Sequence, residues 1–258
     1  MVKGRYSKPI LSWSLPEEPP PFDLQPGVYH RVLDKQPPRS YPSTSFNPYA
    51  GFTFDKYGRL LNASKKVVAG TRFAPVVDDK RKIVPTLYLA STDRAAYAEI
   101  LVRGKTSTQL TYNSIVNLER VTIEINNTLS LLALTPPFLD DTDKNHYKIS
   151  EGDLIYSKQR YYPETCRFAS EALQKYTRIQ GLHWLSRQED NNSVYVLFEN
   201  RIDPTGFVQK ANFDALSLSE LRIWVPDAAA IGVKIDKALF AYLDTTMPEF
   251  RLYKHYFR

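Results

Sequence analysis

Alternating and continuous apolar positions predict a series of short strands along most of the chain. The clearest alternation runs over Leu118–Ile125, where Val121, Ile123 and Ile125 alternate with polar residues and predict a half-buried strand. Thr128–Leu134 follows an Asn-Asn turn and predicts either a hairpin partner for that strand or the next consecutive strand. Other apolar, β-branched runs predict strands at Gly27–Leu33, Thr86–Ala90, Leu182–Ser186, Ser193–Phe198 and Leu218–Val225.

A different spacing predicts one long helix over Pro163–Thr177. Phe168, Ala172 and Tyr176 fall four residues apart and would form one apolar face. Pro163 stands in the first turn, where its missing N–H has no intrahelical partner to lose. The same helix contains Cys166, which we expect to be a small buried residue.

Two further helices are predicted, and the balance of elements indicates the fold class. Ser91 is expected to cap a helix that continues over Arg94–Val102 and ends before Gly104. Lys234–Leu243 is the last predicted helix. Many scattered strands with few helices favour an α+β fold over a doubly wound parallel sheet.

Proline and glycine divide the chain. Pro16–Pro26 holds five of the 18 prolines, so residues 1–26 are expected to form an extended arm packed on the domain. Residues 27–258 would then be the domain itself. Within it, the stretch 36–70 is interrupted by proline and glycine and is expected to be an insertion, and 227–258 is mixed in character.

The composition excludes several classes of protein. With 258 residues, 43% of them hydrophobic and 24% charged, the chain can bury the core of one large domain or two small ones. No apolar run approaches about 18 residues, so no membrane span is expected. Cys166 is the single cysteine, which excludes an internal disulfide and suits a reducing compartment. We therefore expect a cytoplasmic protein.

Charge and motifs narrow the chemistry further. The net charge of +6 favours anionic partners, although the basic residues are spread along the chain and form no nucleic-acid motif. No two glycines stand two apart, which excludes a Gly-x-Gly phosphate loop. Four scattered histidines and no close acidic cluster predict no metal site. His146 and His183 are expected to be structural.

Six segments that occur in order carry a family resemblance. They are Tyr29-His30-Arg31, Gly70-Thr71-Arg72-Phe73, Leu87-Tyr88-Leu89-Ala90-Ser91, Ala98-Glu99, Gly181–Arg187 and Val194–Phe198. In this ordered set, which covers roughly residues 27–200, the chain resembles the RES-domain family. The chain departs from the family pattern in the length of its 36–70 stretch and at Val225-Pro226-Asp227, which lacks the serine usual there.

The resemblance implies a fold, an activity and a partner. The fold would be like that of ADP-ribosyltransferases, with a mixed, split β core that binds NAD in a cleft. Family members act as bacterial toxins that are neutralised by a cognate antitoxin with a helix-turn-helix domain. Their activities are NAD degradation, by hydrolysis or phosphorolysis at the nicotinamide bond, and in some members ADP-ribosylation of a protein.

The resemblance also implies which residues form the site. Glu99, Arg31 and Ser186 would be catalytic, and Arg31, Arg72, Tyr88 and Ser186 would bind NAD. The chemistry suits these types, because a carboxylate such as Glu99 stabilises an oxocarbenium-like state. Arg31 and Arg72 can grip a diphosphate. Tyr88 could stack on nicotinamide or bind a ribose hydroxyl, and Ser186 could orient nicotinamide, ribose or Glu99.

Two other functions stay open at this stage. A protein ADP-ribosyltransferase would use the same cleft and differ only in the group that reaches the ribose C1′. A non-catalytic, basic binding module belongs to another class, and it would bind its partner with a steep salt dependence. Taken singly, each site residue also has a structural interpretation, such as an ion pair for Arg31 or packing for Tyr88.

Overall fold

The computed structural model describes about three fifths of the chain. The described residues are 13–19, 21–34, 45–55, 60–68, 70–101, 109–110, 118–135, 154–155, 157, 161–186, 192–203, 207–208, 214–215, 234–235 and 237–246. The predicted strand at Leu218–Val225 and the position of His146 lie outside them.

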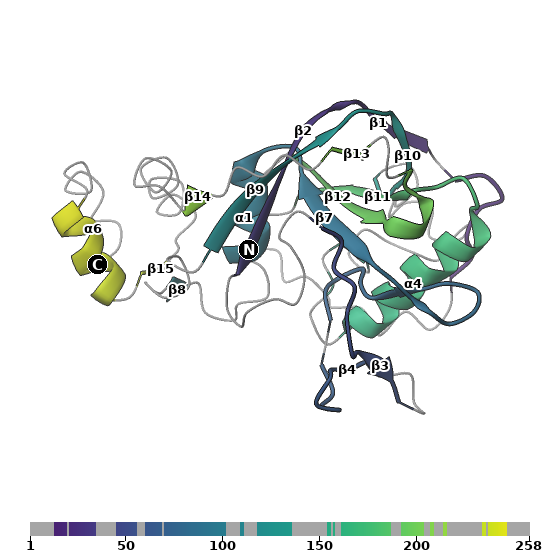
Figure 1. The fold of residues 1–258 in the computed structure, drawn as a ribbon, viewed down its shortest axis with the longest axis horizontal. Coiled ribbons are helices and arrows are strands. Elements are labelled where there is room, and N and C mark those ends of the chain that lie inside the picture. The colour runs from purple at the N-terminus through teal and green to yellow at the C-terminus, as the bar shows by residue number, and fades with distance from the viewer. Residues whose placement is uncertain are drawn as a thin grey trace, which may run out of the picture.

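A nine-stranded mixed sheet forms the centre of the molecule (Figure 1). Its strands follow the order β1, β10, β11, β12, β7, β2, β9, β13, with β14 also pairing with β9. All pairs are antiparallel except β10 with β11, which is parallel. The bounds are β1 Pro21–Leu24, β2 Gly27–Asp34, β7 Thr86–Ala90, β9 Leu118–Ile125, β10 Leu129–Ala133, β11 Gly181–Leu185, β12 Ser193–Phe198, β13 Phe207–Val208 and β14 Asp214–Ala215.

Smaller elements surround this sheet. Three two-stranded sheets pair β3 (Thr53–Phe54) with β4 (Leu60–Leu61), β5 (Val76–Val77) with β6 (Ile83–Val84), and β8 (Gln109–Leu110) with β15 (Lys234–Ile235). The helices among the described residues are α1 (Asp93–Leu101), α4 (Tyr162–Lys175), α6 (Lys237–Thr246) and the 3₁₀ turn η3 (Glu199–Arg201). A mixed sheet with few helices confirms the predicted α+β class. None of the described helices is long and apolar enough to cross a membrane.

The predicted strands in the described residues are confirmed, and of the two alternatives for Thr128–Leu134 the structure supports the next consecutive strand. β9 pairs with β2 along all eight of its residues, from Gly27 opposite Ile125 to Asp34 opposite Leu118. β10 instead pairs with β1 and β11, so the hairpin alternative for β9 and β10 is excluded. The alternation within each strand is a local signal, whereas the choice of partner depends on distant segments.

Two helix predictions need correction at their starts. Thr92 caps α1, because its hydroxyl accepts the Ala95 N–H at 3.1 Å, while the Ser91 hydroxyl accepts the Ser193 N–H of β12. The last helix begins at Lys237 instead of Lys234, because Lys234–Ile235 pairs with β8. The long helix α4 is confirmed within one or two residues of each predicted end.

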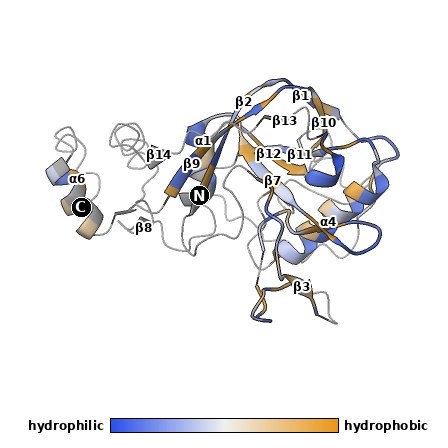
Figure 2. Ribbon diagram, viewed as in Figure 1, coloured by the Kyte–Doolittle hydropathy of each residue, from blue (hydrophilic) through white to orange (hydrophobic). Residues whose placement is uncertain are grey.

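Two hydrophobic clusters cover opposite faces of the sheet. Along β12, Val194, Val196 and Phe198 join the cluster that contains α4, while Tyr195 and Leu197 join the other. This division follows from the alternation of side chains along a strand. Figure 2 shows the hydrophobic colour on β12, the strand that contributes residues to both clusters.

Residues 13–16 of the proline-rich arm lie against α4. The Lys175 ammonium donates to the Leu15 carbonyl at 2.9 Å, and the Tyr176 hydroxyl donates to the Pro16 carbonyl at 2.6 Å. The Trp13 indole N–H donates to the Glu171 carboxylate. After this segment, β1 forms the edge of the main sheet.

The main sheet is split between β2 and β7. These neighbours share one residue pair, His30 with Ala90, and then diverge. At the other end of β7, Thr86 pairs with Asn47 instead of with β2. The divergence leaves room for a cavity at the middle of the sheet.

Candidate active site

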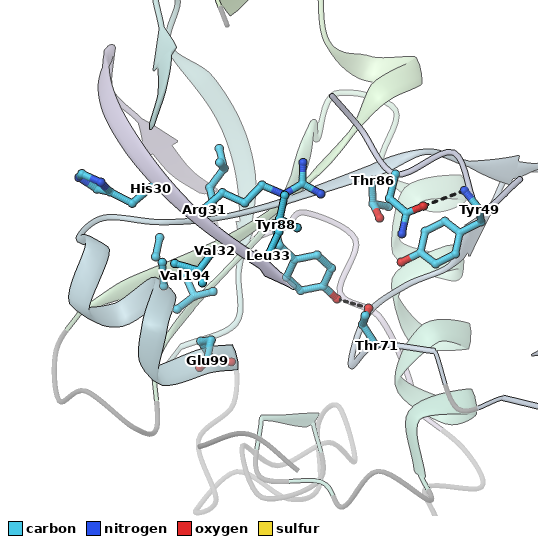
Figure 3. Close-up of a pocket in the computed structure, with 14 residues that line it drawn as sticks. His30, Arg31, Val32, Leu33, Tyr49, Thr71, Thr86, Tyr88, Glu99 and Val194 are labelled. Atoms are coloured by element: carbon cyan, nitrogen blue, oxygen red, sulfur yellow. Dashed lines mark hydrogen bonds between the residues drawn. The ribbon is translucent and has the colours of Figure 1, made fainter. Parts of the chain in front are cut away.

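A cavity of about 230 Å³ lies where β2 and β7 diverge. Side chains from β2, β7, α1 and β12 line it, together with residues 47, 49 and 71 from two irregular segments. Three of the five residues that the sequence predicts for the site are among these lining residues, namely Arg31, Tyr88 and Glu99 (Figure 3).

Glu99 is a buried carboxylate held by a serine from a distant strand. It lies on α1, the helix that follows β7, and its exposed fraction is 8%. Ser186, directly after β11, donates from its hydroxyl to Glu99 Oε1 at 3.1 Å. Ser186 is itself fixed by its N–H, which donates to the Asn192 carbonyl at 2.8 Å. The structure therefore brings two predicted residues into contact across 87 positions of sequence.

Arg31 carries a positive charge into the opposite side of the cavity. Figure 3 shows its guanidinium well separated from Glu99, with Tyr88 between them in this view. Its exposed fraction is 5%, and Nη1 donates to the Ser45 carbonyl at 2.6 Å. In Figure 3 the ring of the neighbouring His30 points away from the Arg31 guanidinium and from Tyr88. Burial lowers the pKa of His30; Asp93 opposes this shift and Arg120 adds to it.

The ring of Tyr88 faces the cavity, and its hydroxyl is hydrogen-bonded to other residues of the protein. That hydroxyl is 2.8 Å from Thr71 Oγ1 and accepts the Phe73 N–H at 2.9 Å. The ring also meets Trp184 edge-on, with centroids 6.1 Å apart. The hydroxyl is thus committed to a turn of the chain, which favours the stacking alternative for Tyr88 over the ribose contact.

Arg72 lies in that turn but does not line the cavity. Residues 70–74, called the 70–74 turn below, bring Thr71 to the cavity edge and bury Arg72 at 6% exposure. The turn closes through the Thr71 N–H, which donates to the Ala74 carbonyl at 2.7 Å. From α4, Thr165 donates to the Arg72 carbonyl and Cys166 to the Thr71 carbonyl. Cys166 is buried, as predicted.

Sequence reasoning missed the segment 45–49, which supplies part of the lining. Asn47 and Tyr49 both face the cavity, and Tyr49 is almost fully buried. Burial raises the pKa of Tyr49, and nearby Tyr88 adds to the shift. The segment lies within the expected insertion and shows no hydrophobic period; its Asn47-Pro48 turn was the single local signal.

His183 lies on the other face of the sheet, away from these residues. Its ring stacks with Phe22 and with Tyr195, with centroid distances of 3.7 and 5.4 Å, and its Nε2 is 2.9 Å from the Ser193 hydroxyl. Burial lowers its pKa to about 4. This environment agrees with the structural interpretation of His183. Within the described ranges, no group of three or more His, Cys, Asp or Glu could hold a metal ion.

Comparisons with known proteins give a family match and a structural likeness to solved proteins. The family model described as the RES domain matches residues 58–236. That match begins after β2, so it includes Arg72, Tyr88, Glu99 and Ser186 but not Arg31, and it both begins and ends later than the resemblance predicted. The toxin–antitoxin complex MbcT–MbcA of M. tuberculosis contains a chain with 15% identity and a TM-score of 0.49, over 77% of this chain and 90% of that one. No curated protein matches the sequence.

Proposed function

Because the chain belongs to the RES-domain family, we propose that it is an enzyme that cleaves NAD at the nicotinamide–ribose bond. The observation that carries this proposal is the buried Glu99 at the cavity, oriented by Ser186 and opposed by the cationic Arg31. A carboxylate and a guanidinium on two sides of one cavity suit a substrate whose reacting carbon becomes positive while its diphosphate is negative.

The reaction breaks the bond between ribose C1′ and the pyridine nitrogen. The bonding electron pair leaves with nicotinamide, and C1′ passes through an oxocarbenium-like state. Water or inorganic phosphate then forms a new C1′–O bond, which gives ADP-ribose or its 1-phosphate and releases one proton. Glu99 stabilises the positive charge at C1′, and Ser186 keeps the carboxylate oriented toward it.

The cavity size determines how much of NAD can lie inside. About 230 Å³ is below the range of roughly 300–1,000 Å³ that is usual for pockets enclosing a whole drug-sized ligand. We infer that the nicotinamide riboside end enters the cavity and that the diphosphate lies toward Arg31. Arg72, one residue from the cavity-lining Thr71, is proposed as a second diphosphate ligand.

The proposal extends to the biological setting. NAD consumption would make the protein a toxin of a toxin–antitoxin pair, acting in the cytoplasm and neutralised by a cognate protein with a helix-turn-helix domain. Residues 1–26 would be an arm on a catalytic domain spanning 27–258. The contacts of Leu15 and Pro16 support the arm, whereas Pro21–Leu24 already belongs to the main sheet as β1.

The test is nicotinamide release from NAD by the purified chain, compared with Glu99→Gln. The substitution keeps the shape of the side chain and its acceptor for Ser186 but removes the negative charge. We expect kcat to fall about 100- to 1,000-fold, the range for losing one preorganised electrostatic contact. Phosphate dependence of the sugar product separates phosphorolysis from hydrolysis.

Glu18→Gln is the matched control, because Glu18 is an exposed carboxylate on the arm. It should release nicotinamide at the wild-type rate. Equal rates for Glu99→Gln and wild type would show that the site is assigned wrongly, and a folded wild-type chain without release would refute NAD cleavage by the chain alone.

A further inference from the structure

The segment 45–49 completes the cavity from outside the region that matches the family model. Asn47 donates its N–H to the Thr86 carbonyl at 2.8 Å and accepts the Thr86 N–H at 3.2 Å. This two-bond bridge extends the sheet on the side of β7 that β2 leaves. The segment therefore replaces a strand at the split and places its own side chains on the cavity surface.

Tyr49 is held in this segment by an uncommon backbone conformation. Its φ of +49° lies in the left-handed region, which bulky L residues rarely adopt. The Asn47 side chain stabilises the turn by accepting the Tyr49 N–H at 2.9 Å, and the Tyr49 carbonyl accepts the Phe52 N–H at 2.9 Å. Backbone conformations of this uncommon kind persist where the surrounding contacts hold them in place, and they are frequent at ligand-binding sites.

The part of the cavity around Tyr49 is uncharged. The hydroxyl-bearing residues Tyr49, Thr71, Thr86 and Tyr88 line it, while the charged Arg31 and Glu99 lie elsewhere on the surface. Figure 3 shows the phenol end of Tyr49 directed toward Tyr88 and Thr71. The Tyr88 hydroxyl is bonded to the 70–74 turn, and the Tyr49 hydroxyl interacts with the side chains of Thr71 and Thr86. The Tyr49 phenol and the two threonines therefore form one cluster of hydroxyl groups on this wall.

A flat, neutral, hydrogen-bonding group suits such a wall. Two aromatic side chains can pack against a ring, and hydroxyls can both donate to and accept from an amide. An anion would lose its hydration there and would share the cavity with the Glu99 carboxylate. In the proposed binding mode the diphosphate lies toward Arg31 and matches its charge, so that charge does not compensate a second anion on this wall.

We propose that Tyr49 is a specificity-determining residue that contacts the carboxamide of the nicotinamide ring. The site then selects a dinucleotide with an uncharged pyridine substituent over one with a carboxylate. This inference rests on the proposed NAD cleavage and adds a residue to it that lies outside the family match.

The experiment compares the wild type with Tyr49→Phe on two substrates. The substitution keeps the aromatic ring and removes the hydroxyl. The value of kcat/KM is measured for NAD and for the analogue whose pyridine ring lacks the carboxamide. We expect a loss of about 2- to 10-fold with NAD, the range for one neutral hydrogen bond, and no loss with the analogue. The carboxylate analogue of NAD should be a poorer substrate for the wild type, and Tyr49→Phe should narrow that gap.

Tyr29→Phe is the control, because Tyr29 is a buried tyrosine in the other hydrophobic cluster whose hydroxyl donates to the Gln25 carbonyl at 2.6 Å. It should leave the ratio between the two substrates unchanged. If Tyr49→Phe loses the same factor with NAD and with the analogue, or loses nothing with NAD, the carboxamide contact is refuted while NAD cleavage stands. A wild-type chain that releases no nicotinamide overturns both.

Discussion

Two irregular segments form walls of one cavity, and they are anchored in different ways. The 70–74 turn is bound to the interior, since α4 donates to two of its carbonyls and the Tyr88 hydroxyl accepts its Phe73 N–H. The segment 45–49 is bound to the cavity's own residues. Its backbone pairs with Thr86, and its Ser45 carbonyl accepts from Arg31.

This difference predicts different consequences when each wall is disturbed. The 70–74 turn is continuous with the core through α4, so damage there should lower the stability of the whole domain. The segment 45–49 has its anchors at the site, so damage there should alter substrate binding more than stability. Recognition can therefore be altered in one wall while the other keeps the fold intact.

The largest effect is expected from Gly70→Ala, which breaks the 70–74 turn. Gly70 has a φ of +68°, and a Cβ there would lie 2.7 Å from the Ala74 carbonyl oxygen. Backbone strain of this kind costs about 1–3 kcal/mol, and the clash with backbone places the loss of unfolding free energy near the upper end. Urea unfolding measures it.

Gly27→Ala is the matched control for this substitution. A Cβ at Gly27 would meet nothing nearer than Tyr29 side-chain atoms at 3.8 Å, so its unfolding free energy should stay within about 0.5 kcal/mol of the wild type. If Gly70→Ala were as stable as Gly27→Ala, the turn would not be the rigid wall described above.

Acid should lower the free energy of unfolding through His183, which stacks with Phe22 and Tyr195 on the face of the sheet away from the cavity. Burial lowers the His183 pKa from 6.5 to about 4, so between these values the unfolded chain binds more protons than the native one. The stability contribution is complete above pH 6.5 and is lost as the pH falls toward 4. At pH 5 the loss is about 2 kcal/mol.

His183→Gln should remove most of this pH dependence, which urea unfolding at pH 7 and pH 5 would measure. The pKa of His30 is also lowered, so a residual slope of the same sign remains in the variant. An unchanged pH dependence in His183→Gln would mean that His183 is protonated without cost in the native state.

The smallest effect is expected at the segment 45–49, from Asn47→Ala. The variant loses the side-chain acceptor for the Tyr49 N–H, which should cost about 1 kcal/mol of stability and raise KM for NAD. Asn62→Ala is matched to it, because the Asn62 side chain accepts the Lys66 N–H at 2.9 Å in a turn away from the cavity. Steady-state kinetics should show a raised KM for Asn47→Ala alone; equal KM values in both variants would remove the distinction between the walls.

The sequence predicted the regular elements because their signals are local. The alternation of β9 and the four-residue spacing in α4 lie within single segments. The partners of β9 and β10 depend on distant segments, so the sequence left the hairpin and the consecutive-strand alternatives open until the structure separated the two strands. The cap of α1 was assigned one residue too early because Ser91 and Thr92 are both good caps, and Ser193 of β12 decides between them.

The candidate site was predictable in the same uneven way. An ordered set of short motifs indicated Glu99 and Ser186, which the structure joins by a hydrogen bond. Tyr49 could not be identified as a cavity residue from the sequence. Its position depends on a turn and on a two-bond bridge to Thr86, and no periodic pattern of hydrophobic residues predicts either. The role of Arg72 stays a prediction, since its turn reaches the cavity through Thr71.

The order of strands in the sheet has a consequence for how the protein is made. β1 pairs with β10 more than a hundred residues later, and β2 pairs with β9 about ninety residues later. Contacts between such distant segments form slowly, and during synthesis they wait for the later strands to leave the ribosome. Glu99 cannot meet Ser186 until the chain has grown past β11. A nascent chain of this protein therefore lacks an assembled site until most of it has been translated.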